Sequence, residues 1–566
     1  MKSEKCKAFI QKIVYMICFM WPICADWVWE TQYWQYGVII QTLLSVSVSV
    51  AIWFSLSWKK ERPWKYLIWC AVCAVGGAIG YYIWSKNPGS IFKGQYISGI
   101  FAVLAVGVTL LRFWTDRSII KDKIKKMPFF FWLWVAMSIY MLLSRHESIW
   151  PGWYLVLFGT WYLAPTSKET DKVLIRSMAD AIILGFVILQ AFAFGFRPFD
   201  EVRYRGMYDN VNLHSIFLAA VYAMVLYRLY LAYTENDKWK IVKRVAYTFL
   251  AGAIPVLIFF TLCRTTLIVV AMVILAYFIL LLKQFGWKKI IIIGCSLLLS
   301  LAICVPVVYG SIRYLPTILH HPIWWANEYS ESKVHSFDPW NSEKYISWDE
   351  FAEVALGRFY IPVEKEEPEM SEAITPQAEG MLSEESTDVP EDEIVPEENS
   401  VAETGTEEPA DTVWYGEDVL IPEGWTLNDV LQQEYLNDAQ ATDSVIVRLF
   451  IWRQHIDNLN IIGHKSSEAY EFHMTKDSFV QHAHNVFIQW AYWYGVPAGI
   501  SFIILTGAIL FVPIKRFWRE GRADDLMVVL VWLSFVGMGI AECVVYPAQV
   551  ILILAYLVPR VLLTKE

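Results

Sequence analysis

Residues 477–505 read DSFVQHAHNVFIQWAYWYGVPAGISFIIL, a polar segment that runs directly into a long apolar one. Similar apolar stretches recur throughout the 566 residues, of which 56% are hydrophobic. The mean hydropathy of +0.38 is too high for a soluble protein of this size. Since a bilayer core requires roughly 20 apolar residues per helix, the chain is predicted to be an all-α integral membrane protein.

The apolar runs predict about 14 transmembrane helices. They are expected near residues 8–25, 36–58, 65–84, 96–114, 128–143, 150–164, 176–196, 210–233, 246–263, 266–283, 288–309, 483–513, 525–541 and 545–562. The first is expected to be a retained helix, because no small-residue cleavage site follows it.

Lysine and arginine gather in alternate connections between these runs. The basic connections are 59–62, 121–126, 168–176, 238–244, 283–289 and 515–522. Basic loops stay on the cytoplasmic side, so both termini of this multi-pass protein are predicted to be cytoplasmic. The connection 197–209, the turn around Arg264 and the long stretch 310–482 then lie outside the cytoplasm.

The chain divides into three predicted parts. Residues 1–309 form a membrane domain of about 11 spans, and residues 483–566 form the last spans. Between them, 310–482 is one large extracytoplasmic loop. Its segment 361–410 carries 15 Glu, 2 Asp and 6 Pro against one base, Lys365, and is predicted to be disordered.

The flanks of the acidic segment have ordinary composition and are expected to form a small helical cap. In particular, the run from Asp443 to Arg453 fits one amphipathic helix, with Asp443 or Ser444 as its N-cap.

The unusual polar residues lie in external elements at membrane boundaries, where charged groups are costly and often functional. One element contains Arg203, Arg205 and Asn212, and a second contains Arg264. The third comprises Arg448 and the string His482-Ala483-His484-Asn485.

These residue types are suited to chemistry on a phosphorylated lipid. Arginine is always charged and binds phosphate in a bidentate manner. A neighbouring histidine can remove a proton from an attacking hydroxyl near neutral pH. We therefore predict that Arg264, Arg205 and Arg448 bind a diphosphate and that His484 is the general base. Glu542, at the end of a span, is expected to pair with an arginine.

The same elements resemble the motifs of the O-antigen ligase and polymerase superfamily of bacterial membrane glycosyltransferases. The similarity lies in Arg205 to Asn212, Cys263-Arg264-Thr265, Ser444 to Trp452, and His482 to Asn485 followed by Gly495 and Gly499. The resemblance covers roughly residues 200–510. It departs at two positions, where Val211 replaces a proline and Cys263 replaces a serine.

The resemblance implies a GT-C-like fold and a defined reaction. A glycan would pass from undecaprenyl diphosphate to an acceptor hydroxyl outside the cytoplasmic membrane, with inversion and without a metal or other cofactor. The supporting residues would be His482, Asn485, Asn212 and Arg203. This activity belongs to polysaccharide assembly in the cell envelope.

Several alternatives remain open at the level of sequence. The acceptor can be another repeat unit, a lipid core sugar or a protein side chain. A transporter or flippase for the same lipid is a different class, although transporters place polar residues near the midplane. A zinc site using His482, His484 and His464 or His473 lacks the carboxylate or cysteine ligands usual for zinc. Membrane lipid is an expected partner, and nucleic acid is not.

Overall fold

A computed structural model describes most of the membrane part of the chain and little of the long loop. The described residues are 2–24, 33–56, 63–86, 94–115, 117–146, 148, 150–196, 203–208, 210–319, 351–352, 355, 412–415, 419–422, 445–465, 473–475, 478–479, 482–542, 544 and 549–563. The predicted disordered segment 361–410 lies outside them, as does the predicted N-cap at Asp443 or Ser444.

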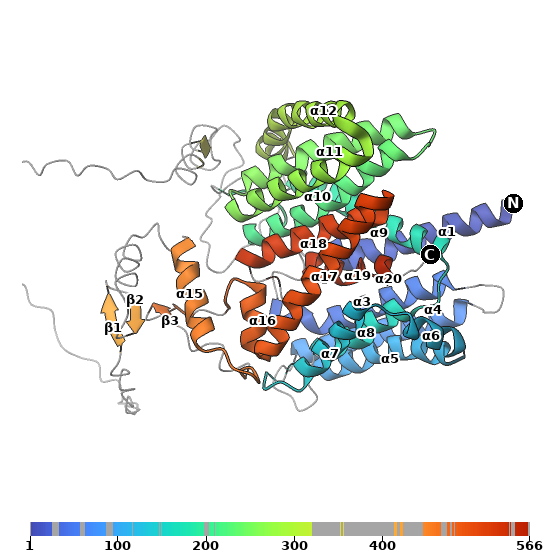
Figure 1. Ribbon diagram of the computed structural model, residues 1–566, viewed down its shortest axis with the longest axis vertical. Helices are drawn as coiled ribbons and strands as arrows, with labels where there is room; N and C mark the ends of the chain where they lie inside the picture. Colours follow the sequence, from blue (N-terminus) through green and yellow to red (C-terminus); the bar gives the residue numbers. More distant parts are fainter. Residues whose placement is uncertain are drawn as a thin grey trace, which may run out of the picture.

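The first helices form one side of the bundle (Figure 1). They are α1 (Lys2–Cys24), α3 (Tyr33–Ser55), α4 (Pro63–Lys86), α5 (Gly94–Thr115), α6 (Arg117–Lys125), α7 (Phe129–Leu142) and α8 (Trp150–Leu163). Helices α3, α4 and α5 pack against one another, and α1 packs on α3 and on α9. Hydroxyl groups link α3 to α5, because Thr42 and Ser49 of α3 donate to carbonyl oxygens of α5.

The remaining helices complete the bundle. They are α9 (Lys168–Phe196), α10 (Val211–Thr234), α11 (Lys240–Phe260), α12 (Arg264–Ile318), α15 (Val445–Asp457), α16 (Val486–Tyr494), α17 (Val496–Glu520), α18 (Ala523–Ala541), α19 (Val550–Leu557) and α20 (Arg560–Leu563). Helix α10 is the centre of this group, because α9, α11, α12, α18 and α19 all pack on it. Its most apolar window is buried along its whole length.

Seven helices of the described chain are long and apolar enough to cross a membrane, or eight if the bent pair α5 and α6 is one span. Shorter apolar helices cover Ile40–Ser55, Phe129–Leu142 and Val550–Leu563. Large apolar side chains, such as Leu275 and Leu298 of α12, point outward and are more than 60% exposed. An outward apolar surface on helices of this length is typical of a multi-pass membrane protein. The full count of 14 spans stays a prediction.

Helix α12 contains the two spans predicted at 266–283 and 288–309. Gly286 interrupts it with φ 70° and ψ 166°, which is not a helical conformation. The apolar range Arg264–Leu315 has 52 residues. At 1.5 Å per residue this range is about 78 Å long, more than twice the thickness of a bilayer core, so it is too long for one straight pass.

The single helix predicted at 483–513 was wrong, because the chain turns at Gly495. There α16 ends and α17 begins, and Gly495 has φ 97°. The backbone N–H of Val496 donates to the carbonyl oxygen of Asn460, at 2.9 Å. A Cβ atom on Gly495 would lie 1.9 Å from the Ile461 carbonyl oxygen. The segment after α15 therefore docks directly against this turn, and only glycine permits the approach.

Gly495→Ala is expected to destabilise the protein by about 2–4 kcal/mol, since it adds both backbone strain and a steric overlap. Thermal unfolding of the purified protein in detergent measures this loss. Gly507→Ala is the matched control on the same helix, where a Cβ atom would meet nothing within 4 Å. A melting temperature for Gly495→Ala that equals or exceeds that of the control would contradict the packing described.

Only short pieces of the long loop are described, so the predicted helical cap stays a prediction. Helix α15 (Val445–Asp457) confirms that a helix lies in the predicted run, although its apolar side chains do not gather on one face. However, two short antiparallel pairs accompany it: β1 (Thr412–Tyr415) with β2 (Val419–Pro422), and β3 (His473–Thr475) with β4 (Ser478–Phe479).

The two ends of the bundle differ. Figure 1 shows both chain termini, α6 and α20 at one end, and α15 with the strands at the other. Helix α15 packs on α16. Helix α6, which lies in one of the basic connections predicted to be cytoplasmic, is at the end that carries both termini.

Candidate active site

The predicted base, His484, lies at the mouth of α16 in an unusual backbone conformation. Its φ angle is 47°, a region that non-glycine residues rarely adopt. The next residue, Asn485, caps α16: its side-chain oxygen accepts hydrogen bonds from the backbone N–H groups of Phe487 and Ile488. The Asn485 amide nitrogen also donates to the carbonyl oxygen of Ile540. Asn485 thus fixes the string between α16 and the end of α18.

The other members of the string are also held closely. The His482 and His484 rings meet edge to face with centroids 4.2 Å apart. The backbone N–H of Ala483 donates to the side-chain oxygen of Gln489, at 2.5 Å. Gln489 is fully buried on α16. These contacts determine the direction in which His484 projects.

Glu542 joins the histidine to an arginine. Its Oε2 atom lies 3.7 Å from Nδ1 of His484, an ion-pair distance longer than a hydrogen bond. Its Oε1 atom accepts a hydrogen bond from Nη2 of Arg448, at 2.9 Å. The carboxylate is only 6% exposed, so it is a buried negative charge between two positively charged or protonatable groups. Sequence reasoning predicted an arginine partner for Glu542 and missed its contact with His484.

Arg448 extends the chain of contacts to the third element. Its Nη1 atom donates to the Thr265 hydroxyl, at 3.4 Å. Thr265 follows Arg264, which is the first residue of α12 and has an exposed side chain. The turn before it is strained as well, because Leu262 has φ 50° while almost completely buried. His484 and Leu262 are the non-glycine residues with positive φ in the described chain. Such strain clusters at functional sites.

The connection before α10 packs against the same turn. The backbone N–H of Tyr204 donates to the carbonyl oxygen of Phe260, at 2.8 Å. Arg203 donates to the carbonyl oxygen of Thr261 and to the side-chain oxygen of Asn212. Arg203 and Asn212 therefore hold the connection in place. Arg205 lies in this connection and is 8% exposed.

A buried pair of hydroxyl groups links α10 to α12. Thr266 of α12 donates to Ser215 of α10, at 2.7 Å. Asn210 caps α10 by accepting from the backbone N–H of Asn212. The predicted elements around Arg205 and Arg264 are consequently neighbours. Arg448 connects the Arg264 element to Glu542, and Glu542 lies beside His484.

Within the described residues, no three His, Cys, Asp or Glu side chains are grouped so as to hold a metal ion.

Two histidines beside the site are held neutral by their surroundings. Burial, followed by the charge of His484, lowers the pKa of His482 to about 3. Burial likewise lowers the pKa of His455, on α15, to about 4. An unfolded imidazole has a pKa of about 6.5. Below that value the unfolded chain takes up protons that the folded protein does not, so the free energy of unfolding falls as the pH falls.

Acidification from about pH 7 to about pH 5 is therefore expected to lower the melting temperature of the protein. His455→Gln removes one of the two groups and is expected to make this fall smaller. Thermal unfolding of both proteins across the pH range measures the difference. If acidification lowered the melting temperatures of the wild-type protein and the variant by the same amount, His455 would not be neutral in the folded protein.

Searches against protein families and against curated proteins find no match for this chain.

Proposed function

We propose that this protein is an O-antigen ligase or polymerase-like glycosyltransferase. It transfers a glycan from undecaprenyl diphosphate to an acceptor hydroxyl on the outer face of the cytoplasmic membrane, with both termini in the cytoplasm. The observation that supports this most is the chain of contacts from His484 through Glu542 and Arg448 to Thr265. It combines a base and phosphate-binding groups at one end of a helical membrane bundle.

The arrangement supports a single displacement. His484 takes the proton of the acceptor hydroxyl, whose oxygen attacks the anomeric carbon and breaks its bond to the diphosphate. Because Nδ1 faces Glu542, the other ring nitrogen, Nε2, is the atom available to the acceptor. The Glu542 carboxylate stabilises the imidazolium that forms, as the aspartate does beside the catalytic histidine of a Ser-His-Asp triad. Arg264, Arg205 and Arg448 stabilise the charge on the departing lipid diphosphate.

Reconstitution tests the proposal. The purified protein is incorporated into proteoliposomes with an undecaprenyl-diphosphate-linked glycan, and the products are separated by size and by lipid content. Glycan longer than one repeat, or glycan joined to a lipid core or protein acceptor, supports transfer and identifies the acceptor class. Movement of the donor between leaflets with no new glycosidic bond would overturn the proposal in favour of a flippase.

Glu542→Gln is expected to slow transfer by roughly 100-fold, because it preserves the shape of the side chain but removes the charge that orients and stabilises His484. Single-turnover transfer with saturating donor measures the rate. Glu520→Gln is the matched control, since Glu520 is half exposed at the far end of α17. Equal rates for the two variants would show that Glu542 does not act through the base.

A further inference from the structure

Two consecutive isoleucines are exposed at the tip of a turn in the long loop. The turn covers residues 460–463, between α15 and α16, and its middle residues are Ile461 and Ile462. Their side chains are 69% and 57% exposed. Turns that face water are usually made of glycine, proline, asparagine, aspartate or serine. A pair of isoleucines in this position therefore favours an apolar environment around the tip.

The backbone of this turn is held firmly. The N–H of Gly463 donates to the side-chain oxygen of Asn460, at 2.6 Å. The carbonyl oxygen of Asn460 accepts from the N–H of Val496, and the N–H of His464 donates to the carbonyl oxygen of Trp493. Gly463 has φ 78°, and a Cβ atom there would lie 2.1 Å from the Trp493 carbonyl oxygen. The turn is thus fastened to the junction of α16 and α17, and its two isoleucine side chains remain outside.

The same turn is also fastened to the end of α7. The Tyr140 hydroxyl, on α7, donates to the carbonyl oxygen of Ile461. The backbone N–H of Arg145, just after α7, donates to the carbonyl oxygen of Ile462, at 2.9 Å. Both carbonyl groups of the tip are therefore paired with α7 and the residues that follow it. The isoleucine side chains are the part of the tip that still needs a partner.

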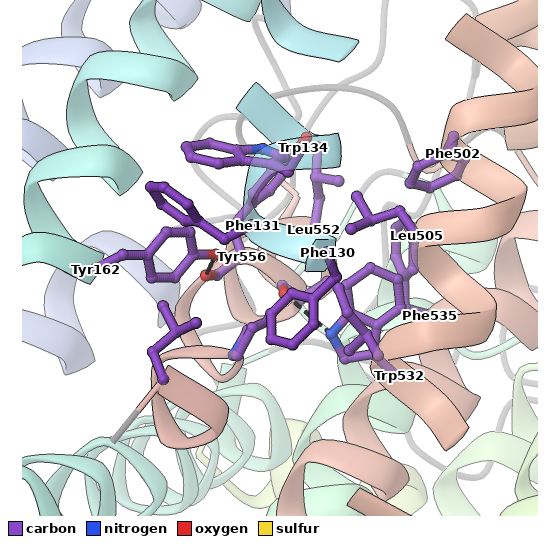
Figure 2. A pocket seen from close by; sticks show the side chains of 14 residues that line it. Phe130, Phe131, Trp134, Tyr162, Phe502, Leu505, Trp532, Phe535, Leu552 and Tyr556 are labelled. Atoms are coloured by element: carbon purple, nitrogen blue, oxygen red, sulfur yellow. Dashed lines mark hydrogen bonds between the residues drawn. The ribbon is translucent and has the colours of Figure 1, made fainter. Parts of the chain in front are cut away.

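Helix α7 stands against a helix of membrane-spanning length. It packs on α17, and Figure 2 shows Phe130 of α7 with Phe502 and Leu505 of α17 around one small apolar pocket. Helix α17 is long and apolar enough to cross a membrane. The turn contacts the last part of α7 and the first residue of α17, so it lies at the level where α17 enters the bilayer.

The residues around the tip have the composition of a membrane boundary. Leu143, directly after α7, is 81% exposed. Arg145 and Lys465, which flank the contacts of the turn, are exposed cations. Cations at such a level keep their charge among lipid head groups while their stems cover apolar surface. Both helices that hold the turn also expose apolar side chains near it in the chain, namely Ile139 and Leu142 on α7 and Ile500, Ile503 and Ile504 on α17.

We propose that this turn is a membrane anchor, in which Ile461 and Ile462 enter the acyl layer of the leaflet at the end of the bundle opposite the chain termini (Figure 1). Arg145 and Lys465 lie among the phosphates of that leaflet. The occupant of this surface is phospholipid, because the tip continues the outward apolar surface of α7 and α17. Helix α15 ends shortly before the tip, so the anchor keeps α15 close to the bilayer. The anchor does not depend on the proposed glycan transfer.

Site-specific photo-crosslinking of the full-length protein in phosphatidylethanolamine–phosphatidylglycerol nanodiscs tests the anchor. The variant Ile462→p-benzoylphenylalanine reacts on irradiation with C–H bonds within its reach, and intact-protein mass spectrometry detects the mass of an added phospholipid. This variant is expected to give roughly tenfold more phospholipid adduct than Asn458→p-benzoylphenylalanine, because an apolar tip partitions into hydrocarbon. Asn458 is the matched control, an exposed polar residue of the same segment.

Two further positions complete the experiment. Leu298, exposed on the outer surface of α12, carries the photoreactive residue as the positive control. Leu143 is a second test position on the α7 side, and the melting temperature of each variant shows that it has folded. With Leu298 reactive, the proposal is overturned if folded variants at positions 462 and 143 give no more phospholipid adduct than position 458. It is also overturned if position 462 instead crosslinks to a second copy of the protein, which would make this surface a protein interface.

Discussion

His484→Ala is expected to lower glycan transfer by roughly 10³-fold while donor binding stays nearly unchanged, because general base catalysis accounts for about 10²–10⁴ in rate. The imidazole acts on the acceptor, whereas the arginines bind the donor. Single-turnover transfer and equilibrium binding of the lipid-linked glycan, measured on the same preparation, separate the two effects.

The backbone conformation of His484 requires its own control. Its φ of 47° means that alanine could also disturb the turn before α16. Asparagine and glycine tolerate positive φ, so His484→Asn and His484→Gly preserve the turn while removing the base. All three variants are expected to be equally inactive. If the Asn or Gly variant transferred at nearly the wild-type rate, His484 would have a conformational role and His482 would become the candidate base.

The pH dependence of transfer follows from the same role. A histidine accepts a proton only when it is neutral, so transfer by the wild-type protein is expected to slow in acid. Any residual activity of His484→Asn should lack this dependence.

Arg264→Ala is expected to weaken donor binding by about 10- to 100-fold, the loss that corresponds to one charge-assisted hydrogen bond to phosphate. Arg264 is exposed at the start of α12, beside the Thr265 hydroxyl that Arg448 contacts. Its side chain is therefore accessible to a lipid diphosphate. Binding of undecaprenyl diphosphate to the purified variant measures the loss directly.

The control must match the charge removed. Arg453→Ala deletes one positive charge from α15, where Arg453 is half exposed and faces Asp457 at 3.5 Å. If both arginine variants lost donor affinity equally, the loss would come from the overall positive charge of the outer surface and not from a specific contact of Arg264. A rate defect with unchanged affinity in Arg264→Ala would assign this residue to the reacting diphosphate rather than to the bound donor.

Much of the architecture was predictable from local patterns. Apolar length alone indicated a helical membrane protein, and the run from Asp443 to Arg453 predicted a helix, which the structure contains as α15. These features depend on residues close in the chain, so composition and periodicity reveal them. The turn at Gly495 was missed because it depends on residues far from it in the chain. The Ile461 carbonyl oxygen, in a different segment, lies so close that position 495 must be glycine.

For the candidate site too, the sequence and the tertiary structure determined different features. The sequence by itself determined which groups are unusual: His484, Arg264 and Arg448, charged or titratable residues at the boundaries of apolar runs. Only the tertiary structure decided how they are joined. Glu542 lies 94 residues from Arg448, and Thr265 lies 183 residues from it. Contacts over such separations depend on how α12, α15 and α18 pack, and packing is a property of the folded bundle that no local pattern contains.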